Sequence, residues 1–223
     1  MKKAFIFDMD GVLIDTEKLY LKYWKISGKE AGYDIKDQYV LGIRSLPAVL
    51  AREKMKSYLG QEFDYDGIKQ KRRQMMEEHI KENGVERKAG AVELLTYLKE
   101  EGYVIGVATA TELIRAKGYL EQIEILPFFD AVISAHMVEK GKPEPDIYEY
   151  AAKQLGVEAS KCYAVEDSKN GVTAAYRAGC QTIAIKDLDE PDEETLSMCV
   201  TKVNRLDEII SYLENNKKKQ ESN

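Results

Sequence analysis

The N-terminal segment AFIFDMDGVLIDT, residues 4–16, constrains the fold more than any other part of the chain. Its first four residues, three of them large and apolar, lead directly into Asp8 and Asp10, and Gly11 follows. A short apolar run that ends at a turn signal is typical of a buried parallel strand. Side chains alternate along a strand, so the two carboxylates should point the same way. Ligands bind at the C-terminal ends of strands in open α/β sheets, so the pair is expected at a binding edge.

Beyond residue 86, short apolar runs alternate with helical patterns. Four further strands are predicted, at residues 103–108, 130–134, 162–165 and 182–185. Helices are predicted between and after them, at residues 91–100, 112–122, 146–155, 168–177 and 207–213. This alternation predicts an α/β fold in which a parallel sheet carries helices on both faces. The polar end of the chain, residues 215–223, is predicted to be frayed.

Residues 16–86 carry helical patterns and no convincing strand. Thr16 is predicted to cap the first helix, because apolar residues follow it at helical spacing. Two further helices are predicted at residues 46–59, with Pro47 in the first turn, and at 68–81. The sequence therefore predicts a core domain formed by residues 1–15 and 87–223, and an inserted all-helical domain formed by residues 16–86.

The composition limits the classes of partner. A formal charge of −6 and a pI near 5.2 argue against binding of nucleic acid or another polyanion. No apolar run approaches the roughly 20 residues of a membrane span. The three cysteines form no CxxC pair, which is typical of free thiols in a reducing compartment. We therefore expect a cytoplasmic protein without a membrane partner, and a monomer, since no long apolar stripe is left unassigned.

Polar side chains follow the predicted strands at corresponding places. Thr109 follows the second strand and Lys142 the third. Glu166 and Asp167 follow the fourth. Each has an ordinary explanation by itself: a threonine often caps a helix, a loop lysine is often exposed, and acidic residues complement a helix N-terminus. Right-handed crossovers place the C-terminal ends of parallel strands at one edge, so we expect these side chains to meet the N-terminal carboxylates.

These residue types fit phosphoryl transfer, which needs a nucleophile, charge neutralisation and positioning. Asp8 can attack phosphorus and form an aspartyl-phosphate. Asp10 can protonate the leaving oxygen and then activate water. Lys142 can hold the phosphoryl oxygens, and Thr109 and the backbone N–H of Ala110 can donate hydrogen bonds to the same group.

Magnesium is the predicted cofactor, because Mg²⁺ prefers hard oxygen ligands in near-octahedral geometry. Asp8, the backbone carbonyl of Asp10 and Asp167 can supply such ligands. Glu166 is a further candidate, either as a direct ligand or as a neighbour that orients the ligands. The alternative explanation of Asp8 and Asp10 is a solvated aspartate pair at a strand end.

Four stretches of the chain together resemble the haloacid dehalogenase-like superfamily. They are Asp8-Met9-Asp10-Gly11-Val12, Thr109, Lys142-Pro143-Glu144-Pro145 and Glu166-Asp167. Their order and spacing match, and the likeness extends over the chain apart from its polar tail. The resemblance implies a Rossmann-like core, a mobile helical cap inserted after the first strand, and a Mg²⁺-dependent reaction through phospho-aspartate. Dehalogenases of the superfamily lack the second aspartate, so Asp10 argues against dehalogenation.

Within the superfamily, the helical insert is similar to that of beta-phosphoglucomutase and the small sugar phosphatases. Arg44 stands where this branch has a phosphate-binding arginine, and Lys71 where the mutase has a lysine, although each can equally be a solvated cation. Tyr20 stands where the mutase has a histidine that restrains premature hydrolysis. This difference favours a phosphatase acting on a small phosphorylated metabolite, such as a sugar phosphate or phosphoglycolate, over an intramolecular phosphomutase.

Two other functions fit the chain less well. A phospho-aspartate signalling module of the receiver type is much shorter and has no such helical insert. A dinucleotide oxidoreductase would need a GxGxxG motif after the first strand, and the sequence has none there. Substrate identity is expected to depend on the insert, where Tyr20, Arg44, Ser45 and Lys71 are candidates.

Overall fold

The computed structural model describes residues 3–44, 46, 48–188 and 190–221, so Ser45 and Pro47 lie outside the described residues. The chain divides into two compact units. The first contains the residues up to Asp15 and those from Glu86 onward, and the second is Thr16–Val85. No helix among the described residues combines the length and the apolar character that a membrane crossing requires.

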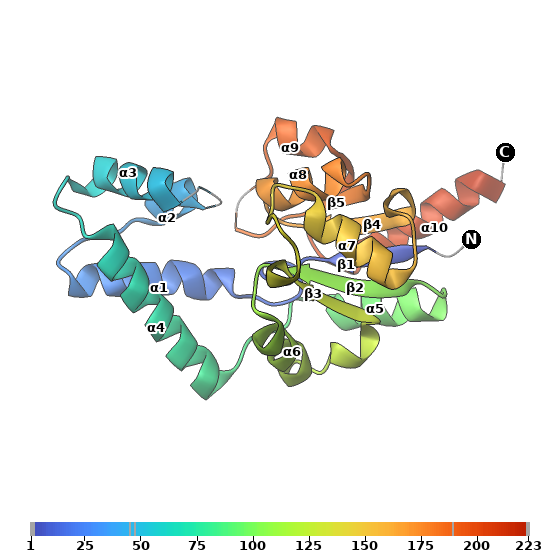
Figure 1. Cartoon of the computed structure of the whole chain (residues 1–223), viewed down its shortest axis with the longest axis horizontal. Helices are drawn as coiled ribbons and strands as arrows, with labels where there is room; N and C mark the ends of the chain where they lie inside the picture. The colour runs from blue at the N-terminus through green and yellow to red at the C-terminus, as the bar shows by residue number, and fades with distance from the viewer. Residues whose placement is uncertain (1–2, 45, 47, 189, 222–223) are drawn as a thin grey trace. The chain divides into compact units, whose positions relative to one another are not determined.

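The first unit is built on a parallel sheet in the order β3-β2-β1-β4-β5-β6 (Figure 1). Its strands are Ala4–Phe7 (β1), Val104–Thr109 (β2), Ala131–Ser134 (β3), Cys162–Glu166 (β4), Gln181–Ile185 (β5) and Cys199–Val203 (β6). The order reverses at β1, because β2 and β3 lie on one side of it and β4 to β6 on the other. The C-terminal ends of β1 and β4 therefore flank the switch point at which ligands bind in such sheets. The parallel sheet confirms the predicted α/β fold.

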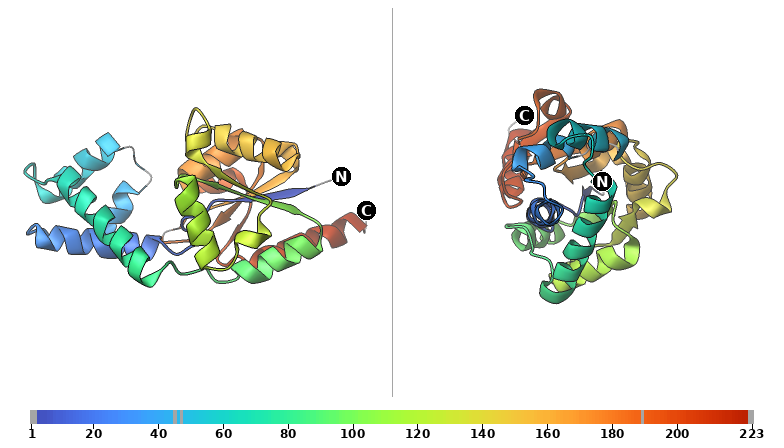
Figure 2. Two further views of the ribbon diagram at one scale, coloured as in Figure 1. Left: turned by 60° about the horizontal axis from the view of Figure 1, so that its bottom comes forward. Right: turned by 90° about the vertical axis from the view of Figure 1, so that its left-hand side faces the viewer.

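Helices cover both faces of this sheet (Figures 1 and 2). They are α5 (Ala91–Glu100), α6 (Leu113–Gln122), α7 (Asp146–Leu155), α8 (Lys169–Arg177), α9 (Glu193–Ser197) and α10 (Glu208–Glu221), with short 3-10 turns at Leu126–Phe128, Ala135–Met137 and Ala159–Lys161. On one face, Ile147 and Ala151 of α7 pack in one core with Ile6 of β1 and Ala164 of β4. On the other face, Phe5 of β1 stacks on Tyr163. Successive residues of β1 thus point to opposite faces and both are buried, as expected for a central parallel strand.

Two parts of the first unit differ from the prediction. The edge strand β6 was not predicted, because CVTKV is short, half-polar and only partly buried. The tail from residue 215 was predicted to be frayed, and this is wrong up to Glu221, because α10 continues through it. Lys217 pairs with Glu101, and its ammonium lies 5.5 Å from the centre of the Tyr97 ring. These contacts hold the polar segment against α5.

The second unit contains four helices and no strand among its described residues. It consists of α1 (Glu17–Glu30), α2 (Asp37–Ile43), α3 (Ala48–Leu59) and α4 (Tyr65–Asn83). Trp24 of α1, Met55 of α3 and Ile68 of α4 are buried in its own hydrophobic core. Helix α2 was not predicted. Thr16 is the N-cap residue of α1, as predicted, although its side chain makes no capping hydrogen bond to the helix.

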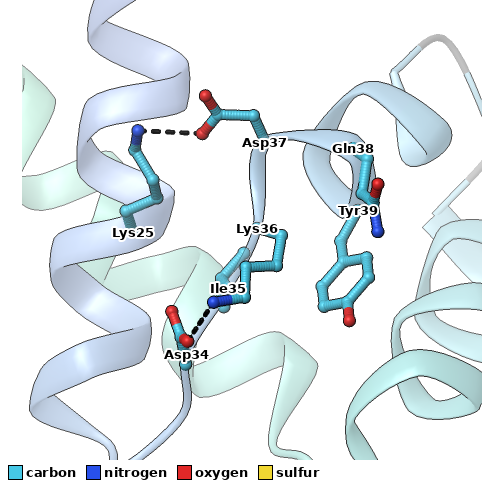
Figure 3. A pocket seen from close by; sticks show the side chains of 7 residues that line it. All are labelled: Lys25, Asp34, Ile35, Lys36, Asp37, Gln38 and Tyr39. Atoms are coloured by element: carbon cyan, nitrogen blue, oxygen red, sulfur yellow. Dashed lines mark hydrogen bonds and ion pairs between the residues drawn. The ribbon is translucent and has the colours of Figure 1, made fainter.

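An open pocket of about 590 Å³ lies in this helical unit (Figure 3). It is lined by Lys25, Asp34, Ile35, Lys36, Asp37, Gln38 and Tyr39. Its charges are already compensated, because Lys25 bonds Asp37 at 2.8 Å and Lys36 pairs with Asp34. It contains none of the predicted site residues.

Candidate active site

The sheet brings several predicted side chains to the switch point. Asp8 follows β1 directly, and its backbone N–H donates to the carbonyl of Val165 in β4 over 3.0 Å. Glu166 is the last residue of β4, and Thr109 is the last residue of β2. Parallel pairing therefore places all three at the same edge of the sheet.

Lys142 connects these strand ends. Its Nζ donates to Glu166 Oε1 over 2.6 Å, to the carbonyl of Ala108 over 3.0 Å, and to Asp8 Oδ1. The Glu166 side chain is fully buried, and those of Lys142 and Asp8 are only 14% and 10% exposed. An ammonium group has three protons to donate, so this lysine is saturated by its three acceptors.

The electrostatics of the cluster are dominated by burial. Burial raises the pKa of Asp8 to about 8, the charges of Glu166 and Asp10 add to the rise, and Lys142 opposes it. Burial alone would lower the pKa of Lys142, but the carboxylates of Asp8 and Glu166 hold it above its ordinary value. A buried ammonium therefore faces an excess of carboxylates, which a bound cation would compensate.

The metal-free protein should lose stability as ionisation of Asp8 proceeds. The pKa of this carboxyl is about 8 in the folded chain against 3.8 for a free aspartate, so the folded state binds the proton more tightly. Linkage then lowers the free energy of unfolding as the pH rises from about 4 to about 8. In EDTA, we expect the Tm of Asp8→Asn to exceed that of the wild type by a margin that grows across this window. A margin independent of pH in differential scanning fluorimetry contradicts the assignment.

The donor set at this edge fits a magnesium ion. Asp8, Glu166 and Asp167 each offer a carboxylate oxygen, and these atoms lie within 4.8 Å of one another. Gly11 adopts φ +80°, and a Cβ built at this residue would lie 2.4 Å from Asp167 Oδ2. Glycine is therefore required here both by the turn and by the neighbouring carboxylate.

The side chain of Asp10 has a partner that we did not predict. Thr111 Oγ1 donates to Asp10 Oδ2 over 2.9 Å, and the backbone N–H of Thr111 donates to Thr109 Oγ1 over 3.0 Å. Ser134 Oγ donates to the carbonyl of Thr111 over 2.8 Å. Thr109 is fully buried, whereas Ala110 is exposed. The two-residue spacing of the threonines in VATAT was the available signal for Thr111.

Glu166 also has a partner that we did not predict. The hydroxyl of Tyr148, in the first turn of α7, donates to Glu166 Oε1 over 2.6 Å. Burial, and then the charge of Glu166, raise the pKa of Tyr148 well above its ordinary value, so this hydroxyl keeps its proton. Nothing in the sequence separates this tyrosine from an ordinary core residue of an amphipathic helix.

The candidates in the helical unit have different surroundings. Arg44 Nε lies 3.2 Å from Glu17 Oε2, with both side chains largely buried. Lys71 pairs with Glu30 on the surface, and its side chain is 51% exposed. The neighbouring Arg72 is half-buried, and its guanidinium lies 4.5 Å from the centre of the Tyr20 ring. The signal for Arg72 was its position four residues after the core residue Ile68.

Comparison with known proteins places the chain in a family. A family model described as haloacid dehalogenase-like hydrolase matches residues 5–185. The phosphorylated carbohydrates phosphatase of Thermotoga maritima is 30% identical over 187 residues, which cover 81% of this chain and 83% of that protein. The beta-phosphoglucomutase of Bacillus subtilis is 30% identical over 192 residues, which cover 82% and 83% of the two chains. The crystal structure of beta-phosphoglucomutase from Clostridium difficile has the same fold, with a TM-score of 0.73, 22% identity and full coverage of both chains. The chain thus belongs to the haloacid dehalogenase-like hydrolase family.

Proposed function

We propose that this protein is a Mg²⁺-dependent phosphatase that hydrolyses a small organic phosphomonoester, of the phosphorylated carbohydrate class, through a phospho-aspartate at Asp8. The observation that carries the proposal is the meeting of Asp8, Lys142 and Glu166 at the switch point of the sheet, with Asp167 within reach. A carboxylate beside a buried ammonium is suited to attack a phosphoryl group, because the ammonium can neutralise the negative charge of the phosphoryl oxygens.

In this mechanism each side chain has one task. Asp8 attacks phosphorus in line with the leaving oxygen, so that an acyl-phosphate forms as the ester bond breaks. Lys142 moves from its carboxylate partners to the phosphoryl oxygens, where Thr109 and the N–H of Ala110 also donate. Mg²⁺, held by Asp8, the Asp10 carbonyl and Asp167 with Glu166 beside them, would supply charge neutralisation when bound.

Asp10 is proposed as the acid and base of the two half-reactions. It gives a proton to the leaving oxygen in the first step and takes one from water in the second. The hydrogen bond from Thr111 restrains one of its oxygens. A threonine hydroxyl in this place therefore supports the orientation of the carboxyl group.

The substrate class rests on the Thermotoga maritima relative, whose name states phosphorylated carbohydrates as its substrates. We propose that the helical unit acts as a cap that excludes water and selects the leaving group. Arg44, Tyr20 and Lys71 are its predicted binding residues. Arg72 is added to them because its Nε atom is buried and has no hydrogen-bond partner among the described residues.

A phosphomutase is the second candidate, because the Bacillus subtilis beta-phosphoglucomutase is equally similar to the chain. Tyr20, at the position of the mutase histidine, argues for the phosphatase. Its ring packs against the guanidinium of Arg72 and against Trp24, with ring centres 6.3 Å apart. Burial raises the pKa of Tyr20 above the ordinary value of a phenol, so this hydroxyl is no replacement for an imidazole in proton transfer near neutral pH.

Metal removal tests the proposed reaction directly. With Mg²⁺ present, we expect the protein to release inorganic phosphate from p-nitrophenyl phosphate and from members of a panel of sugar, polyol, nucleotide and glycolate phosphates. EDTA should abolish the release and added Mg²⁺ should restore it, because the carboxylate excess around Asp8 then has no counter-charge. The measurement is colorimetric assay of free phosphate.

The same assay separates the two candidates. Isomerisation of a hexose phosphate that needs a bisphosphate activator and releases no net phosphate would establish the mutase. Release of phosphate that is insensitive to EDTA would contradict the metal-dependent mechanism.

A further inference from the structure

We infer that Tyr148 is a positioning residue that holds Glu166 in one orientation, so that Oε2 is the oxygen it presents to the magnesium site. The inference rests on the proposed metal site and goes beyond it. It gives a function to a tyrosine that has no direct contact with the proposed substrate, and it distinguishes the two oxygens of a carboxylate whose role the sequence left open.

Both short hydrogen bonds of Glu166 end on the same oxygen. Oε1 accepts from Tyr148 and from Lys142, each over 2.6 Å. Oε2 accepts only a longer bond among the described residues, 3.3 Å from Ser168 Oγ. Hydrogen bonds to an ionised oxygen are about twice as strong as neutral ones, so the two donors fix Oε1 and leave Oε2 for a cation.

The surroundings leave Glu166 little freedom to turn. The residue is fully buried, and a Cβ built at Gly171 of α8 would lie 2.0 Å from its Oε1 and 2.1 Å from its Oε2. The carboxylate therefore lies directly against the helix backbone on one side. Tyr148 also lies against Lys142, because the ammonium is 5.3 Å from the centre of its ring.

The hydroxyl and the ring of Tyr148 have separable tasks. Phenylalanine would keep the ring beneath Lys142 and the packing of α7 on the sheet, and would remove only the bond to Oε1. Oε1 of Glu166 would then be held by Lys142 alone, and Lys142 also donates a hydrogen bond to Asp8. Loss of a hydrogen bond that orients a ligand typically costs 10–100-fold in metal affinity.

The test is direct metal binding by Tyr148→Phe. Titration of the metal-free protein with Mn²⁺, followed by electron paramagnetic resonance, should show a Kd raised by about tenfold or more. The Mg²⁺ concentration for half-maximal phosphate release should rise in parallel, with little change in KM once metal is saturating. Tyr163→Phe is the matched control, because it makes the same chemical change at a buried tyrosine of β4 that has no hydrogen bond to Glu166, and it should bind Mn²⁺ like the wild type.

Each other outcome has a defined meaning. If Tyr148→Phe binds Mn²⁺ as tightly as the wild type, Tyr148 is only a core residue and the inference is wrong, whatever happens to its Tm. All titrations are performed well below the lowest Tm of the set, so that every variant is native. If the wild type itself binds no Mn²⁺, or binds it equally well after Asp167→Asn, the proposed metal site is wrong and the inference is lost with it.

Discussion

Asp8→Asn should abolish the release of phosphate from every substrate that the wild type accepts. In the proposed mechanism an anionic oxygen of Asp8 attacks phosphorus, and the amide of asparagine lacks this oxygen. Removal of a nucleophile from an enzyme typically costs on the order of 10⁴–10⁶ in kcat. The measurement is turnover of p-nitrophenyl phosphate in saturating Mg²⁺, with the Tm recorded to show that the variant is folded.

Asp34→Asn provides the control for this substitution. It makes the same chemical change at an exposed aspartate of the helical unit, and it should leave turnover unaltered. Near-normal activity of Asp8→Asn would remove the phospho-aspartate from the mechanism, while loss of activity in both variants would point to an effect on folding.

Lys142→Met should lower activity and stability together. The substitution keeps the length of the side chain but leaves Asp8 and the fully buried Glu166 without their shared cation. Loss of one partner of a buried ion pair typically costs about 3–5 kcal/mol of unfolding free energy. Loss of an electrostatic stabiliser of the transition state costs about 10²–10³ in kcat.

Magnesium distinguishes these two effects of Lys142→Met. The ion supplies positive charge beside the same carboxylates, so it should recover much of the lost Tm and little of the lost kcat. Lys140→Met, at an exposed lysine two residues earlier, should change neither. A Lys142→Met protein with the Tm of the wild type in EDTA would show that the lysine is not needed to balance the carboxylates.

The parts of the structure that the sequence predicted well share one physical basis. β1 and β4 are apolar runs that are buried on both faces. Charged residues are excluded from such a run, so the first carboxylate after it marks the end of the strand. The sequence alone therefore locates Asp8 and Glu166 at one edge of the sheet. Edge strand β6 follows no such rule, because its partly exposed side chains permit Thr201 and Lys202.

The contacts that the sequence did not predict depend on side-chain orientation. Thr111 and Tyr148 contact the acidic groups only because the loop after β2 and the first turn of α7 place them there. The hydrophobic pattern of the sequence does not show such contacts. Lys71 and Arg72 illustrate the same limit, since adjacent residues of one helix differ in burial by their angle around its axis. The exposure of Lys71 makes Arg72 the better candidate for a residue that binds substrate.

The three acceptors of Lys142 have a consequence for synthesis of the protein. Asp8 leaves the ribosome long before its partner, because 134 positions separate the two along the chain. Glu166 is made later still, so a nascent polypeptide that ends before Glu166 carries the proposed nucleophile, Asp8, without both of the groups that surround it. In the proposed mechanism, activity should therefore arise only after β4 has docked beside β1, and the appearance of phosphate release during translation would report that event.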